Sequence, residues 1–262
     1  AEVVACEDFK IPQIRKRLVT IFTRNKNGKK FLRDKGSFLG HLRSSKKITL
    51  RSAISHLPEL HAIEGKNERC DFHPLHFVSI MKPEKYWWVS HTKKGDQAYN
   101  NQCVKCNYQE NQRHLDKNVD GKWVSNKSTP INCTECGELL PRPTMIDKVT
   151  GKRRLIKGFH SAYRRMHYDR PANTLTQNFV FEASDNKLHP DQNRVLSIYE
   201  ALIVQTIDKY DYDFKLDGKY ISKSKFAQII GESVPPLLIE NVVSGIKDSM
   251  KESIPTTLFQ AF

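Results

Sequence analysis

The chain has 262 residues, of which 38% are hydrophobic and 10% aromatic, enough to bury the core of one large or two modest domains. No run approaches the roughly 18 apolar residues of a membrane span, and the first residues lack a secretory signal, so we expect no membrane and a cytoplasmic protein. Lys and Arg number 43 against 29 Asp and Glu, and this net charge of +14 indicates a polyanionic partner.

The positive charge is concentrated in two blocks. Residues 1–50 hold 13 basic and 4 acidic side chains, and residues 142–170 hold 9 basic and 2 acidic side chains. This distribution favours nucleic acid over the alternative of a merely soluble basic protein.

The first predicted element is a strand at residues 18–23, where the β-branched run LVTIFT is bounded by charged residues. Pro12 favours a turn in the basic segment before it. Because the run is apolar on both faces, the strand belongs in the middle of a sheet whose neighbours this chain does not supply.

An irregular segment follows, from about residue 25 to residue 157, with short strand-like pieces between Pro and Gly residues. One short helix is predicted within it, capped by Thr49 and stopped by Pro58. The pattern is typical of a small, loop-rich domain and not of a regular α/β unit.

Four of the six cysteines form two Cys-x-x-Cys pairs, Cys103 with Cys106 and Cys133 with Cys136, with 26 residues between the pairs. Two such knuckles can present four sulfur atoms to one tetrahedral ion, so the spacing predicts a structural Zn²⁺ site without an open position for water. Gly137 suits the positive φ of the turn after the second pair. Disulfides and redox dithiols are the alternatives, and a cytosolic chain without βαβ context favours neither.

Beyond residue 158 the pattern becomes helical. Ser197 and Glu200 form a capping box that opens a helix through about Gln205. A second short helix, SKSKFAQII, is predicted to break at Gly231.

The last predicted element is a long amphipathic helix that begins at two prolines in the segment SVPPLLIENVV. Leu238, Val242 and Ile246 recur every four residues along it. This apolar stripe predicts that the helix docks on a surface that this chain does not supply.

Four segments in a fixed order resemble the later motifs of the DNA cytosine-5 methyltransferase family. FKIPQIRKRLVTIFTRN resembles the Gln-x-Arg-x-Arg motif and its strand, and YRRMHYDRPANTLTQN resembles the Arg-Pro-Ala-x-Thr-hydrophobic-Thr motif. LHPDQNRVLSIYEALIVQ resembles the His-Pro, Arg and Glu-Ala segment, and IIGESVPPLLIENVV resembles the final Gly-Asn-x-Val-Pro-Pro motif. The resemblance covers residues 1–24 and 158–251, and the insert between them stands where this family has its target recognition domain.

The resemblance implies an α+β chain, the remnant of an α/β methyltransferase core (a strand plus C-terminal helices) with a small, irregular, zinc-stapled target recognition domain. Residues 1–24 would be a core segment, residues 25–157 the recognition domain, and residues 158–262 the C-terminal motifs and the helix that returns to the core.

The catalytic motifs of the family are missing from this sequence. It has no Pro-Cys dipeptide for the nucleophile and no glycine-rich cofactor loop. Glu240, Asn241 and Val242 spell the family's Glu-Asn-Val tripeptide, but they fall inside the predicted last helix, and we interpret them as a coincidence. The resemblance therefore implies the C-terminal half of the enzyme, inactive without a catalytic half that is a separate chain or a missing segment.

The family transfers a methyl group from S-adenosylmethionine to a cytosine flipped out of double-stranded DNA. By resemblance Arg17 contacts the base, while Arg15 and Gln13 organise the loop around it, and phosphate contacts are the alternative for both arginines. The residues that match the pocket of the methyl donor are Ser233, Val234 and Glu232, the last of which replaces an asparagine.

Thr174 and Thr176 match the family's Thr-x-Thr hydroxyls at the junction of recognition domain and core, with ordinary strand threonines as the alternative. Buried core positions are more typical than DNA contacts for Trp87, Trp88 and Trp123. The side chains expected to reach DNA are Arg153, Arg154, Arg164, Arg165, Arg170, Thr174 and Thr176.

The resemblance places the protein in prokaryotic restriction-modification, associated with the nucleoid. Two other functions remain open. One is a non-catalytic, zinc-containing DNA-binding module derived from such an enzyme, and the other is methylation of transfer RNA, which the large insert disfavours.

Overall fold

A computed structural model describes residues 1–114, 117–124, 129–156 and 161–251, with the backbone alone at 117, 118 and 122–124. Helices and strands are mixed, as an α+β chain requires. The helices are α1 (Lys26–Lys35), α2 (Leu50–Ile54), α3 (Pro83–Ser90), α4 (Ile198–Val204), α5 (Lys223–Glu232) and α6 (Pro236–Met250). The strands are β1 (Glu2–Ala5), β2 (Gln13–Ile14), β3 (Lys16–Val19), β4 (Lys117–Val119), β5 (Lys122–Val124), β6 (Thr144–Ile146), β7 (Arg153–Leu155), β8 (Ala172–Asn173), β9 (Lys215–Leu216) and β10 (Lys219–Tyr220).

The strands of the described residues form five two-stranded sheets, of which two position the site. β1 pairs antiparallel with β3, so that Val3 lies opposite Leu18. β2 pairs in parallel with β8, so that Gln13 lies opposite Ala172. The second pair joins segments that are about 160 residues apart in the chain and thereby brings two of the predicted motifs together.

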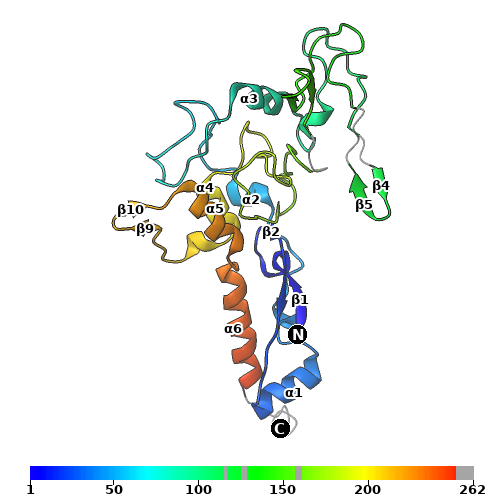
Figure 1. Ribbon diagram of the computed structural model, residues 1–262. Coiled ribbons are helices and arrows are strands. Elements are labelled where there is room, and N and C mark those ends of the chain that lie inside the picture. The colour runs from blue at the N-terminus through cyan, green and yellow to red at the C-terminus, as the bar shows by residue number, and fades with distance from the viewer. Residues whose placement is uncertain (115–116, 125–128, 157–160, 252–262) are drawn as a thin grey trace.

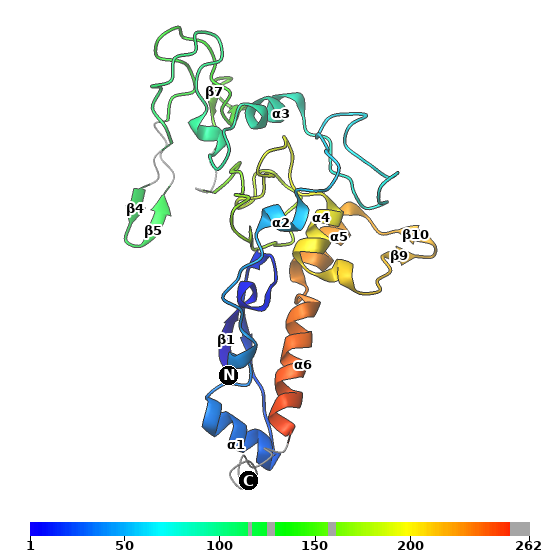
Figure 2. The same cartoon turned by 180° about the vertical axis from the view of Figure 1, so that it is seen from behind.

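The molecule is elongated (Figures 1 and 2). α6 runs beside β1, which pairs with β3, and these elements form a stalk with α1 across its free end. α2, α4 and α5 form the middle, and the segment that carries β4–β7 lies at the other end.

The stalk has its own hydrophobic core, to which Leu238 and Val242 of α6 contribute. Gly245 lets α6 approach the backbone, because a Cβ there would meet the Phe38 carbonyl oxygen at 2.4 Å. The other members of this core are Val4, Cys6, Phe9, Ile11, Phe38 and Leu39, with Val19, Ile21, Phe31, Leu42 and Leu237 packed against them.

Two predictions are therefore wrong. Two of the three stripe residues of α6, Leu238 and Val242, pack on this chain's own first 42 residues, so the missing half need not cover them. Residues 25–42, assigned to the recognition domain, belong to the stalk because Phe31, Phe38 and Leu39 bury their side chains there. Residues 157–160, where that domain was expected to end, lie outside the described part of the chain.

The predicted strand at residues 18–23 is also shorter than expected and is not buried. β3 ends at Val19, and the side chains of Leu18 and Phe22 are 69% and 91% exposed. The reason is that β3 pairs only with β1 among the described residues, and no other segment of them covers its outer side.

The start of α4 confirms the predicted capping box. The hydroxyl of Ser197 accepts from the backbone N–H of Glu200, and the carboxylate of Glu200 accepts from the N–H of Ser197. Thr49 caps α2 as predicted, but this helix ends at Ile54, well before Pro58.

A break at Gly231 was predicted for α5, and this prediction is wrong, because the helix continues to Glu232. Glycine is required there for close packing, because an added Cβ would lie 2.2 Å from the backbone nitrogen of Gln177. The two prolines begin α6, as predicted.

Gly231→Ala should therefore destabilise the chain by about 1–3 kcal/mol or more, since backbone atoms must shift to admit the methyl group. Gly40→Ala is a matched control, because its Cβ would meet only Ser37, at 3.6 Å. Thermal unfolding of both variants measures the difference, and equal melting temperatures would contradict this packing argument.

By length and composition alone, the segment Lys223–Met250 is apolar enough to cross a membrane. It consists of two helices of 10 and 15 residues, interrupted at residues 233–235. Neither reaches the roughly 20 residues of a spanning helix. Phe226 and Leu238 bury their side chains in the two cores, so both helices dock within the protein.

Candidate functional site

The four motif segments meet in one buried hydrogen-bond network. The side-chain amide of Gln13 donates to Gln205 Oε1 at 2.6 Å, and its Oε1 accepts from the backbone N–H of Leu175 at 2.9 Å. Gln205 Nε2 in turn donates to the carbonyl oxygen and the hydroxyl of Ser233, each at 2.8 Å. We call this network the motif junction, and a single residue from each segment is enough to connect it.

Arg15 closes the motif junction from a buried position, with 3% of its surface exposed. Its guanidinium donates to the carbonyl oxygen of Leu175 at 2.6 Å, of Gly231 at 2.9 Å and of Ser233 at 3.1 Å. Because these bonds use both terminal nitrogens inside the protein, Arg15 is not placed to contact a phosphate.

Gln205 is held in place by the helix that ends before it. Burial alone would raise the pKa of Glu200 in α4, but Arg194 lowers it to about 2. The guanidinium of Arg194 makes two bonds to this carboxylate, at 2.6 and 2.7 Å, with both side chains fully buried. An ion pair of this kind fixes α4 and hence the position of Gln205.

Arg17 is positioned differently from Arg15. It lies in β3 opposite Val4, is half-buried, and donates to the carbonyl oxygen of its neighbour Lys16 at 2.8 Å. Among the described residues no carboxylate pairs with it, so its guanidinium retains donors for a ligand.

Thr174 ties the second motif to the first, because its hydroxyl donates to the carbonyl oxygen of Ile14. The ammonium group of Lys187 donates to the carbonyl oxygen of Thr174 at 2.6 Å, and burial lowers the pKa of Lys187 to about 8. Thr176 is exposed and lies beyond β8. The sequence offered no sign of Lys187, since its burial depends on the fold.

The three residues matched to the methyl-donor pocket lie between α5 and α6. Ser233 accepts from Gln205 and Arg15, while Val234 is 41% exposed. Glu232 is exposed and accepts from Gln228 at 3.3 Å. The backbone of Ser233 is therefore fixed by hydrogen bonds, while the side chains of Glu232 and Val234 on either side of it are exposed to solvent.

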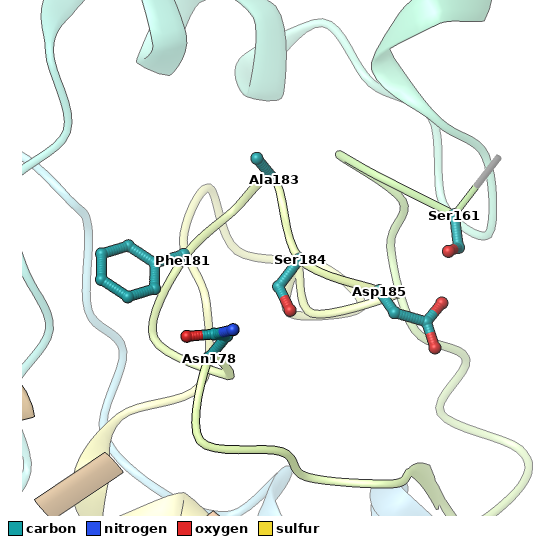
Figure 3. Close-up of a pocket in the computed structure, with 6 residues that line it drawn as sticks. All are labelled: Ser161, Asn178, Phe181, Ala183, Ser184 and Asp185. Atoms are coloured by element: carbon teal, nitrogen blue, oxygen red, sulfur yellow. The ribbon is translucent and has the colours of Figure 1, made fainter. Parts of the chain in front are cut away.

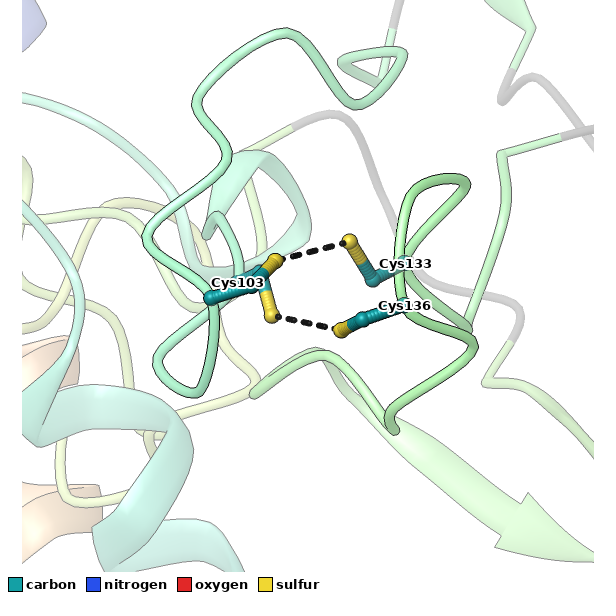
Figure 4. A group of neighbouring side chains, drawn as sticks. Cys103, Cys133 and Cys136 are labelled. Atoms are coloured by element: carbon teal, nitrogen blue, oxygen red, sulfur yellow. Dashed lines mark hydrogen bonds between the residues drawn. The ribbon is translucent and has the colours of Figure 1, made fainter.

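The four paired cysteines converge as the spacing predicts (Figure 4). Sγ of Cys103 lies 3.6 Å from that of Cys136, Sγ of Cys106 lies 3.7 Å from that of Cys133, and all four lie within 4.8 Å of one another. A tetrahedron with Zn–S bonds of about 2.3 Å has S–S edges of about 3.8 Å, so the sulfur atoms fit a zinc ion.

Backbone N–H groups of the knuckles favour the thiolate at two of the four cysteines, Cys103 and Cys133, whereas bonds from the neighbouring thiols and burial raise the pKa of Cys106. Backbone N–H groups of Cys106 and Lys105 lower the pKa of Cys103. Burial raises the pKa of Cys133, but N–H groups of Cys136 and Glu135 outweigh it, and the net pKa is about 6. The turn after the second pair has the predicted positive φ, 71° at Gly137.

Arg142 joins the chain segments around the cysteines. It is fully buried and donates to the carbonyl oxygens of Asn101 at 2.8 Å, Gln112 at 2.9 Å and Pro130 at 2.7 Å. Asn101 lies before the first cysteine pair, and Gln112 and Pro130 lie between the two pairs. Sequence reasoning counted Arg142 only as part of a basic block, because nothing in its spacing indicates burial.

One of the residues expected at DNA is a structural clamp. Arg165 is 3% exposed, and all five of its N–H groups bind protein oxygens. The prediction that it reaches a phosphate is wrong, since no donor is left. The acceptors are the carbonyl oxygens of Thr92, His189, Gln192 and Val89 and Oδ1 of Asn193.

The other basic candidates are more open. Arg153 and Arg154 lie in β7, where Arg153 donates to Glu84 at 2.6 Å and Arg154 to Asp147 at 2.9 Å. Arg164 is half-buried and Arg170 is exposed. Trp88 is 2% exposed and Trp87 is half-buried in the same cluster, as core aromatics are, and the side chain of Trp123 lies outside the described residues.

A hollow of about 600 Å³ lies beside the second motif (Figure 3). It contains none of the predicted site residues. Its lining combines four polar residues with an exposed aromatic ring and an alanine, and consists of Ser161, Asn178, Phe181, Ala183, Ser184 and Asp185.

The motif junction and the cysteine site together define a class of protein. The chain matches the family described as C-5 cytosine-specific DNA methylase over residues 1–248, and it belongs to that family. The match includes the insert, which the resemblance left out.

Individual relatives are type II enzymes. The type II methyltransferase M1.HgaI of Avibacterium volantium is 25% identical over 254 residues, 94% of this chain and 54% of that protein. The type II methyltransferase M.AquIB of Picosynechococcus sp. is 33% identical over 106 residues, 37% of this chain and 71% of that protein. The type II methylase M.HgiDII of Herpetosiphon aurantiacus is 32% identical over 91 residues, 35% of this chain and 25% of that protein. The chain thus spans about half the length of M1.HgaI.

Proposed function

We propose that this chain is the target-recognition half of a DNA (cytosine-5-)-methyltransferase, which methylates a flipped cytosine when joined to a catalytic half. The motif junction carries this proposal. Gln13, Leu175, Gln205 and Ser233 come from the four motif segments, and their bonds hold these segments in one place.

Arg17 is the residue that we assign to the flipped base. The guanidinium of Arg15, two residues before it, donates to carbonyl oxygens within the motif junction. The guanidinium of Arg17 donates to the carbonyl oxygen of Lys16 and retains N–H donors for a base. A guanidinium suits the base because its fixed fork can donate to the carbonyl oxygen and to a nearby carboxylate. Arg15, Gln13 and Thr174 then act as positioning residues.

The outward surface of residues 232–234 is the part that we assign to the methyl donor. The backbone of Ser233 is fixed by Arg15 and Gln205, while Val234 and Glu232 face outward. S-adenosylmethionine, when bound, supplies the methyl group. The nucleophile must come from the catalytic half, since this sequence has no Pro-Cys dipeptide.

Double-stranded DNA is the proposed substrate, in a prokaryotic restriction-modification setting at the nucleoid. The family, described as C-5 cytosine-specific DNA methylase, supports DNA over transfer RNA. Zn²⁺ on Cys103, Cys106, Cys133 and Cys136 would be structural, because four thiolates close the site.

The β1–β3 face, formed by Val3 and Leu18, is where we place the catalytic half. These two side chains lie opposite each other in register and are 61% and 69% exposed. Exposed apolar surface of this kind is typical of an interface, and within this chain the side chains of Val3 and Leu18 remain exposed.

Leu18→Asp should prevent a stable complex with the catalytic half, because a charge would be buried in an apolar interface. Leu216→Asp is a matched control, since Leu216 is 71% exposed in the distant β9–β10 hairpin. Co-expression followed by size-exclusion chromatography should give a one-to-one complex for the unchanged chain and the control only.

The chain alone should self-associate or aggregate in the same experiment. A lone chain that runs as a compact monomer and melts cooperatively would favour the second function, a self-sufficient DNA-binding module.

A further inference from the structure

α1 carries a basic face that the motif junction and the cysteine site do not use. Lys26, Lys29, Lys30 and Arg33 occupy positions i, i+3, i+4 and i+7 of this helix and are exposed. Side chains with this spacing share one side of a helix. These four residues are the α1 basic face, and they are 4 of the 13 basic residues in the N-terminal charge block.

Three of the four cations of the α1 basic face have no acidic partner in the described part of the chain. Among the described residues no ion pair is made by Lys26, Lys29 or Arg33, and Asp34 is the single acidic residue of the helix. Arg24 and Lys35 add two more exposed cations at its ends.

This arrangement opposes the stability of the helix itself. Like charges at i,i+3 and i,i+4 destabilise a helix by about 0.2–0.5 kcal/mol per pair. Cations in the first turn also oppose the helix dipole, which favours anions there. The helix persists because Asn25 caps it and Phe31 stacks on Phe38, with ring centroids 6.1 Å apart. Solvent exposure alone does not explain why four positive charges lie on one face of this helix.

The position of α1 separates it from the recognition insert. α1 lies at the free end of the stalk, whereas the segment with β4–β7 lies at the opposite end of the molecule in both views (Figures 1 and 2). A contact at α1 therefore cannot read the bases that the insert reads.

We propose that the α1 basic face is a second, sequence-independent DNA contact, which binds backbone phosphates outside the recognised sequence. From Lys26 to Arg33 the helix rises about 10 Å, which matches about three phosphates of one strand at 3.4 Å each. The inference rests on DNA as the proposed substrate, since an enzyme that acts on DNA is bound to a polyanion during its reaction.

The test uses the assembled enzyme and a long duplex of mixed sequence. In the variant K26E/K29E/R33E the plot of log K against log salt should lose about 3 units of slope, at about 0.9 per lost phosphate contact. The matched control K209E/K219E/K225E reverses three exposed lysines on another part of the molecule, with the same change in net charge. We expect its slope to stay within about one unit of the unchanged enzyme.

The neutral variant K26Q/K29Q/R33Q controls for misfolding caused by the reversed charges, because it removes the three positive charges without adding negative ones. It should give a smaller loss of slope in the same direction. The kcat at saturating DNA and low salt should be unchanged in all three variants, because α1 is remote from the motif junction. An unchanged slope in both α1 variants, or equal losses in the control, would overturn the proposal.

Vesicles that contain phosphatidylserine separate DNA from a membrane surface as the polyanion. Vesicle binding that the α1 variants abolish, with DNA binding unchanged, would assign the face to lipid and overturn the proposal. An assembled enzyme that binds DNA with the expected slopes but transfers no methyl group would refute the proposed function and leave the α1 contact intact.

Discussion

Cys133→Ser is expected to release the metal and to unfold the insert while the stalk stays folded. The purified unchanged chain should contain one zinc per molecule. Structural zinc sites bind with about 10–16 kcal/mol at neutral pH, and most of this energy is folding energy of the surrounding loops. Loss of one thiolate opens a four-sulfur site whose backbone is otherwise held by Arg142 and a few short turns.

Elemental analysis and thermal unfolding measure the two consequences. Cys70→Ser is the control, because Cys70 is an exposed, isolated thiol outside the cluster. It should retain one zinc and the same melting temperature. Full zinc retention in a variant without both cysteine pairs would show that the metal binds elsewhere.

Arg17→Ala should lower turnover of the assembled enzyme by about 100- to 1000-fold, the cost of removing one donor aimed at a reacting group. Duplex affinity should change little, because the contact with the carbonyl oxygen exists only when the base is flipped out. The structure supports this separation, since Arg17 binds no protein group other than the neighbouring carbonyl among the described residues.

Arg154→Ala in the insert is the comparison, measured by single-turnover kinetics and by DNA binding over a range of salt. It should weaken binding and reduce the salt slope by about one unit, with the single-turnover rate preserved. Arg17→Lys should restore little activity, because an ammonium lacks the fixed fork. Equal effects of Arg17→Ala and Arg154→Ala on binding, with turnover unchanged, would make Arg17 a phosphate contact.

Short-range patterns in the sequence predicted the parts of this fold that depend on local geometry. The capping box at Ser197 and Glu200 and the convergence of the cysteine pairs follow from spacings of three residues or fewer. The start of α6 follows from its prolines, whose φ suits a first turn.

The rest depends on packing between distant segments. A side chain's burial cannot be read from its neighbours in the chain, so Arg165 was expected at DNA and Arg142 was counted only within a basic block, although both are enclosed. The α6 stripe was correctly predicted to dock, but its partner was wrong, because nothing local indicates that residues 31–39 fold back onto it. Gly231 was taken for a helix break because its close contact with Gln177 is a tertiary feature.

Transfer of tritiated methyl groups from S-adenosylmethionine to DNA tests the central claim most directly. The purified chain alone should transfer none, because the nucleophile is absent from it. Mixed with its catalytic half, it should label DNA, and nucleoside analysis should identify the product as 5-methylcytosine. Robust labelling by the chain alone, or a one-to-one complex that yields no 5-methylcytosine, would contradict the assignment of this chain as the recognition half of a cytosine-5 methyltransferase.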